Sequence, residues 1–211
     1  MPHKTQKKTS LVTQRPTNSF QCSACPVATF YRPEENRCKP CQPNSRSYQV
    51  GSVSCMCNAG YKQNGSMNSL YCEACPAGYT SAVAAVACTI CPAGYYSPEK
   101  GSGSCLICDA GSISPSNGSA FCAPCPPGYY SPIAGATACR SAPPGYFSSQ
   151  AGSTGYQICD QGTYSAAPSQ AGCQPCAPGT VTATFGSISE SDCVSPMTNF
   201  IAVRYALLVA F

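Results

Sequence analysis

Cysteine is the residue whose number and spacing could carry chemistry in this chain. There are 19 cysteines among 211 residues, and seven C-x-x-C pairs, with the shortened Cys55-Met56-Cys57, follow one another along the sequence. Thiols at this spacing can bind zinc, exchange electrons in a thioredoxin-like motif, or form structural disulfides. A redox motif would need a βαβ pattern around it, and none is present.

The cysteine pairs form a regular ladder. They begin at Cys22, Cys38, Cys55, Cys72, Cys88, Cys105, Cys122, Cys139 and Cys173. The step is 16 or 17 residues, with one double step of 34 after Cys139. A fixed period of this kind indicates tandem repeats, each a single small structural unit.

Two positions of the ladder lack cysteine, and both belong to one repeat. Ala142 stands where a second cysteine is expected after Cys139, and Tyr156 where a first cysteine is expected before Cys159. If the second cysteine of each pair bonds the first cysteine of the next pair, the two gaps are partners and no thiol is orphaned. This coincidence favours disulfides over a zinc array, which stays as the alternative.

The ladder therefore predicts nine disulfides. They are Cys25–Cys38, Cys41–Cys55, Cys57–Cys72, Cys75–Cys88, Cys91–Cys105, Cys108–Cys122, Cys125–Cys139, Cys159–Cys173 and Cys176–Cys193. Cys22 is left unpaired, because its partner would lie upstream, where there is no cysteine. Disulfides at this density belong to oxidising compartments, so we expect an extracellular or cell-surface location.

Short loops must position these cysteines. The segment CPAGYYSPEKGSGSC, residues 91–105, is typical: Pro and Gly mark turns, and the aromatic pair followed by Ser is a short β-prone run. We expect a small disulfide-rich fold, an elongated array of repeats of about 17 residues with hairpin-like loops and little helix.

Composition agrees with a fold that lacks a large core. Leu, Ile, Val and Phe make up about 14% of the chain and charged residues 9%, both well below ordinary globular levels. After residue 21 the acidic and basic residues balance, so no basic stripe for nucleic acid is present. The only histidine, His3, precedes the repeats, which excludes Ser-His-Asp and Cys-His catalysis there. We expect no enzyme activity, no cofactor, no metal and no small-molecule substrate.

The two ends differ from the repeats at 22–193. Residues 1–21 are basic, lack the apolar stretch of a signal peptide, and are expected to be disordered. Because this conflicts with the disulfides, we expect the sequence to be a fragment or to have a misplaced start. The tail at 194–211 contains an apolar stretch, 200–211, that is too short to span a membrane. Its interpretations are the first part of a transmembrane helix, a short anchor signal, and an end that packs nowhere.

Surface chemistry offers two kinds of candidate site. Asn64 and Asn117 begin N-glycosylation sequons. In the aromatic pairs of the repeats we expect the first ring to pack on the disulfide and the second ring to face a partner. The partner-contact candidates are Tyr96, Tyr130 and Phe147.

The residues at 38–72 resemble the cysteine-rich module of ephrin-receptor ectodomains. The resemblance lies in CQPNS at 41–45 and CMCNAGY at 55–61, and the flanking CPAGYYS units are similar to ephrin-receptor-like tandem repeats, which are related in style to tumour-necrosis-factor-receptor modules. It implies a non-catalytic ectodomain segment that acts as a spacer or in adhesion. A receptor-like ectodomain that binds a protein or glycan through its aromatic loops is the alternative.

Overall fold

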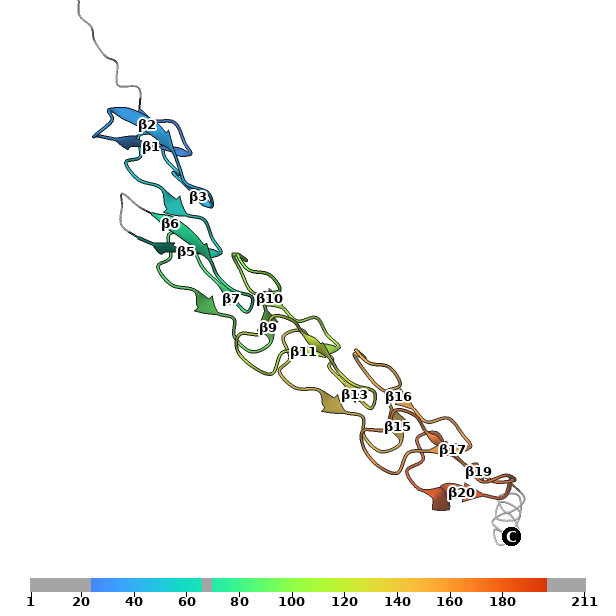
Figure 1. Ribbon diagram of the computed structural model, residues 1–211. Coiled ribbons are helices and arrows are strands. Elements are labelled where there is room, and N and C mark those ends of the chain that lie inside the picture. Colours follow the sequence, from blue (N-terminus) through green and yellow to red (C-terminus); the bar gives the residue numbers. More distant parts are fainter. Residues whose placement is uncertain (1–23, 66–69, 197–211) are drawn as a thin grey trace, which may run out of the picture.

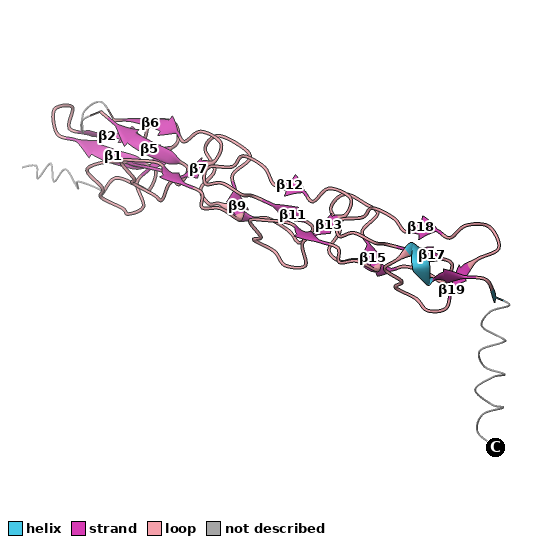
Figure 2. Cartoon of the chain, turned by 90° about the horizontal axis from the view of Figure 1, so that it is seen from below, coloured by secondary structure: helices cyan, strands magenta, loops and turns pink. Residues whose placement is uncertain are grey.

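The computed structural model describes residues 24–65 and 70–196, which form an elongated rod in two perpendicular views (Figure 1 and Figure 2). Short hairpins follow one another along the rod in sequence order, so the described chain runs from one end to the other (Figure 1). This confirms the predicted fold class. Residues 1–21, and all of the 194–211 tail after residue 196, lie outside the described residues.

Each repeat contributes one hairpin. The described residues form ten two-stranded antiparallel sheets, each made of two consecutive strands. The pairs are β1 (Thr29–Arg32) with β2 (Arg37–Pro40), β3 (Ser45–Arg46) with β4 (Met56–Cys57), β5 (Tyr61–Asn64) with β6 (Tyr71–Ala74), β7 (Tyr79–Thr80) with β8 (Thr89–Ile90), β9 (Tyr95–Tyr96) with β10 (Leu106–Ile107), β11 (Ser112–Ile113) with β12 (Ala123–Pro124), β13 (Tyr129–Tyr130) with β14 (Arg140–Ser141), β15 (Tyr146–Phe147) with β16 (Gln157–Ile158), β17 (Thr163–Tyr164) with β18 (Gln174–Pro175), and β19 (Val181–Thr182) with β20 (Cys193–Val194).

One turn of 3₁₀ helix precedes the last strand of the array. The 3₁₀ helix η1 spans Glu190–Asp192 and is drawn in cyan beside β17 and β19 in Figure 2. Ser189 caps it, and the Asp192 carboxylate accepts a hydrogen bond from the Ser189 backbone N–H at 3.1 Å, which completes a capping box.

The Pro-x-Gly-aromatic segments begin the hairpins with a tight turn. In the repeat at 91–105 the Tyr95 N–H donates to the Pro92 carbonyl oxygen at 3.1 Å, and Gly94 has a φ of +83°. A positive φ at the third turn position defines a type II turn, which glycine adopts without the strain of a Cβ. The aromatic pair follows this turn directly and forms the first strand of the hairpin.

The core is a line of sulfur and hydroxyl groups. Six half-cystines are completely buried: Cys57, Cys75, Cys91, Cys108, Cys125 and Cys159. The serine that follows the first strand of the hairpin is buried in most repeats, as at Ser97, Ser114, Ser131 and Ser148. The Ser114 hydroxyl donates to the Tyr95 carbonyl oxygen of the preceding repeat at 3.1 Å, so the buried hydroxyl is satisfied and also joins two repeats.

Backbone stacking extends beyond adjacent repeats. The Gly94 N–H donates to the Ser114 carbonyl oxygen of the next repeat at 2.8 Å. A Cβ added to Gly94 would lie 2.3 Å from the carbonyl oxygen of Gly135, two repeats further on. The same approach, at 2.0 to 2.4 Å, recurs at Gly60, Gly78, Gly111, Gly128 and Gly145. Each of these six repeats thus contacts the next and the next but one, which is further than simple nearest-neighbour stacking.

Candidate functional site

Nine disulfides close the loops of the array. Each joins the two cysteines that the ladder pairs: 25 with 38, 41 with 55, 57 with 72, 75 with 88, 91 with 105, 108 with 122, 125 with 139, 159 with 173, and 176 with 193. Their Cα atoms are 5.5 to 5.7 Å apart, an ordinary disulfide separation. Cys22 lies outside the described residues.

One hairpin of the ten is held without sulfur. Ala142 takes the place of a buried half-cystine and is itself completely buried. The backbone is kept, because the Ala142 N–H donates to the Gly128 carbonyl oxygen at 2.9 Å, just as the Cys125 N–H donates to that of Gly111. The paired strands β15 and β16 retain the register Tyr146 with Ile158 and Phe147 with Gln157.

A tyrosine cluster, defined by Tyr130, Tyr146 and Tyr156, stands at the other empty position. The Tyr156 ring makes edge-on contacts with the rings of Tyr130 and Tyr146, with both centroid distances at 5.0 Å. Such pairs stabilise by about 0.5–1.5 kcal/mol each beyond their burial. Sequence reasoning identified Tyr156 only as a missing cysteine, although an aromatic residue at a lost half-cystine was the available signal.

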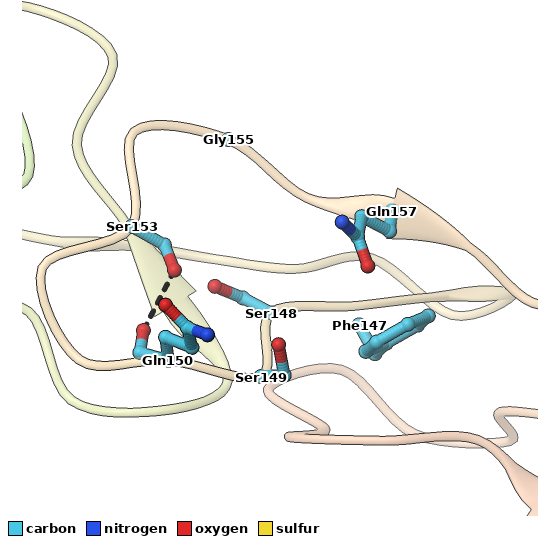
Figure 3. Close-up of a pocket in the computed structure, with 7 residues that line it drawn as sticks. All are labelled: Phe147, Ser148, Ser149, Gln150, Ser153, Gly155 and Gln157. Atoms are coloured by element: carbon cyan, nitrogen blue, oxygen red, sulfur yellow. Dashed lines mark hydrogen bonds between the residues drawn. The ribbon is translucent and has the colours of Figure 1, made fainter.

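The opposite side of the same hairpin borders a small polar hollow. Its volume is about 190 Å³, and it is lined by Phe147, Ser148, Ser149, Gln150, Ser153, Gly155 and Gln157 (Figure 3). The loop that carries these residues is braced by a hydrogen bond from the Ser153 hydroxyl to the Gln150 carbonyl oxygen at 2.6 Å. Sequence reasoning found Phe147 but missed the two glutamines and the serines.

Only some of the polar side chains around the hollow make hydrogen bonds with other described residues. Ser148 is buried and its hydroxyl donates to the Tyr129 carbonyl oxygen at 3.1 Å. The side chains of Ser149, Gln150 and Gln157 are exposed and make no hydrogen bond with other residues that the structure describes. A hydroxyl and two amides therefore remain available, each able to donate and to accept.

In two of the aromatic pairs the first ring is more exposed than the second. Tyr95 and Tyr129 are 37% and 36% exposed, whereas Tyr96 and Tyr130 are only half-buried. That the first ring packs on the disulfide and the second ring faces a partner stays a prediction.

The two sequons lie in contrasting settings. Asn117 is exposed in a turn, and its Oδ1 accepts a hydrogen bond from the Ala93 N–H at 2.9 Å. Its amide nitrogen, the atom that a glycan would modify, has no hydrogen bond within the described chain. Asn64 is half-buried on β5, and its amide nitrogen donates to the Glu73 carboxylate. Ser66 of that sequon is outside the described residues.

Charges gather on the first hairpin and compensate one another. The exposed Glu35 carboxylate forms ion pairs with Lys39 and with Arg37, the second at 2.6 Å. Hydrogen bonds from Lys39 first, and then from Arg37, lower the pKa of Glu35 below its ordinary value. Arg32 lies 3.6 Å from the same carboxylate. The basic side chains of this hairpin are therefore matched locally.

The thiols that a zinc array would need are consumed in the disulfides. No group of three or more Cys, His, Asp or Glu side chains in the described ranges is arranged to hold a metal ion. No helix between residues 24 and 196, outside the gap at 66–69, is long and apolar enough to cross a membrane. His3 and residues 200–211 fall outside the described part of the chain.

Comparison with known families identifies the repeats. The family model described as tyrosine-protein kinase ephrin type A/B receptor-like matches residues 78–120, 111–159 and 156–193, which together cover more than half of the chain. No curated protein matches the sequence. The matched segments include the hairpin without a disulfide and the tyrosine cluster. The chain belongs to the ephrin-receptor-like family of cysteine-rich, non-catalytic ectodomain repeats.

Proposed function

We propose that the repeats at 22–193 form a non-catalytic extracellular spacer, with a role in adhesion, that holds the segments at its two ends apart. The observation that carries this proposal is the stacking: the glycine of one repeat approaches the backbone of the repeat two further on, as Gly94 approaches Gly135. A chain whose units interlock over three repeats resists bending more than one linked only at single joints.

The disulfides supply the stability that this shape cannot draw from a core. Each loop of 13 to 17 residues is stabilised by about 3 kcal/mol relative to the open chain in the loop-entropy model. Because the bonds are local, they stiffen each hairpin and leave the long-range order to stacking. This combination suits an extracellular environment, where disulfides persist and small cores are common.

A second candidate function is ligand binding by a receptor-like ectodomain. It is favoured by the position of Phe147, one of the three partner-contact candidates, beside the hollow of Figure 3. Tyr96 and Tyr130 are half-buried and would offer only part of each ring. The partner would be a protein or a glycan.

Small-angle scattering on the full chain, secreted from eukaryotic cells behind a supplied signal peptide, tests the spacer proposal. We expect an elongated monomer with a radius of gyration well above the value of about 17 Å for a compact protein of this length. Thiol alkylation and peptide mapping of the same sample should find the nine disulfides and alkylate only Cys22. A compact particle, or many reactive thiols, would contradict the proposal.

A further inference from the structure

The hollow beside β15 and β16 has the chemistry of a site for a neutral polyhydroxyl ligand. None of its seven lining residues is charged. The wall combines one aromatic ring, Phe147, with amides and hydroxyls that both donate and accept hydrogen bonds. A sugar ring presents an apolar C–H face and a rim of hydroxyls that also donate and accept, so the two surfaces match in kind.

The size of the hollow limits the occupant to one small group. Its volume of about 190 Å³ is below the range of about 300–1,000 Å³ that holds a drug-sized ligand. One sugar unit at the end of a chain can enter, while the rest of the chain lies along the rod. The free polar groups of Ser149, Gln150 and Gln157 then orient that unit.

The two faces of this hairpin explain how such a site is held. Phe147 and Gln157 are directly opposite each other in the register of β15 and β16, and both line the hollow. Tyr146 and Tyr156 instead meet Tyr130 in the tyrosine cluster. The cluster fixes the hairpin at the point where other repeats use a disulfide, and thereby positions the residues around the hollow.

The neighbouring repeat shows that the site is not a general property of the array. There the residues corresponding to Phe147 and Gln157 are Tyr164 and Gln174, which are paired in the same register. Tyr164 is buried, with 9% of its surface exposed, whereas Phe147 is half-buried. An aromatic ring next to a free amide is accessible in one repeat and covered in the other.

We propose that this hollow binds a single uncharged sugar unit at the end of a glycan. The proposal adds a binding activity to the spacer function and deepens the receptor-like alternative by naming its partner class. It assigns Phe147 as the stacking surface and Gln157, Gln150 and Ser149 as the groups that hydrogen-bond the sugar hydroxyls. A protein partner is the competing occupant, and the test separates the two.

The test uses the secreted full chain on immobilised glycans that end in glucose, galactose, mannose or N-acetylglucosamine, with sialylated and sulfated glycans alongside. We expect retention on at least one uncharged series, and about tenfold weaker retention for Gln157→Ala, because one hydrogen-bonding group is lost. Gln174→Ala is the matched control, since this exposed glutamine occupies the same place in the next hairpin, and it should bind like the unmodified chain.

Three results would overturn the glycan site. They are no retention on any uncharged glycan, retention on acidic glycans only, or equal losses for Gln157→Ala and Gln174→Ala. Thiol mapping of each variant shows whether the nine disulfides are intact, so a folding defect is recognised separately. Scattering of the same samples reports the rod, and the spacer proposal can therefore survive the failure of the glycan site. Binding to a protein ligand that persists after enzymatic removal of its glycans would assign the hollow to protein instead.

Discussion

Restoring the absent disulfide is the most direct test of how this array is built. Positions 142 and 156 have the same sequence separation, 14, as Cys91 and Cys105. In the variant Ala142→Cys/Tyr156→Cys the two introduced thiols should bond during secretion. A loop of this size is stabilised by about 3 kcal/mol in the chain-entropy model.

The same variant loses the tyrosine cluster, and the two effects oppose each other. Tyr156 makes two edge-on ring contacts, which together contribute about 1–3 kcal/mol. The net gain in the free energy of local opening is therefore about 0–2 kcal/mol. Tyr156→Ala removes the rings without adding sulfur, so this control should lose about 1–3 kcal/mol and fall about 3 kcal/mol below the double variant.

Hydrogen exchange measured by mass spectrometry on the segment 143–158 reports this opening free energy directly. Its slow amides should include Gly145, whose N–H donates to the Ser165 carbonyl oxygen at 2.8 Å. Peptide mapping must first establish the new bond. If both introduced thiols react with an alkylating agent in the secreted protein, the two gaps are not disulfide partners in space and the reasoning fails. Faster exchange in the bonded double variant than in Tyr156→Ala would refute the energetic balance.

Three further predictions concern turns, buried hydroxyls and charge. Gly94→Ala should greatly reduce secretion or destabilise the hairpin by more than about 2 kcal/mol, since the added Cβ would lie 2.3 Å from a backbone oxygen. Gly172 has open space around it, so the control variant Gly172→Ala should be secreted normally. Ser114→Ala should lower the free energy of unfolding by about 1 kcal/mol through its lost hydrogen bond. Ser81→Ala should lower it less, because the buried Ser81 hydroxyl has no partner among the described residues. Thermal unfolding of the two variants compares these effects. Because the pKa of Glu35 is lowered, its ionised carboxylate stabilises the first hairpin. This stabilisation is complete above the ordinary carboxyl pKa of about 4.3 and is lost as the pH falls through the lowered pKa. Hydrogen exchange of the first hairpin should therefore change less between neutral and acid pH in Glu35→Gln than in the unmodified chain.

The sequence was sufficient to predict the pairing of the cysteines, because the pairing follows from their spacing along the chain. The ladder has a constant step, and the gaps at Ala142 and Tyr156 reveal which positions belong together. The turns were predictable for the same reason, since Pro92 and Gly94 determine the local backbone by their own conformational limits. Both features depend on neighbours within one repeat.

The features that the sequence did not yield depend on how repeats are placed against one another. The approach of Gly94 to Gly135 is a contact over two repeats, and no periodicity specifies its direction. The greater exposure of Tyr95 than of Tyr96 depends on how a two-residue strand lies against the neighbouring repeats. The hollow near Gln157 likewise results from a loop and a strand that meet only in the folded rod.

The repeat without a disulfide shows the contribution of the turn and the stacking apart from that of the covalent bond, which the other repeats have as well. It lacks the covalent bond, yet the Ala142 N–H and the Gly145 N–H keep the same hydrogen bonds as their counterparts in bonded repeats. The geometry of a repeat is therefore set by its turn and its stacking, while the disulfide mainly reduces the entropy of the unfolded chain. A repeat in the interior of the array, stacked on both sides, can replace its disulfide with an aromatic contact without changing the rod. Its hairpin is then free to vary its outer face, which is where Phe147 and Gln157 border the hollow.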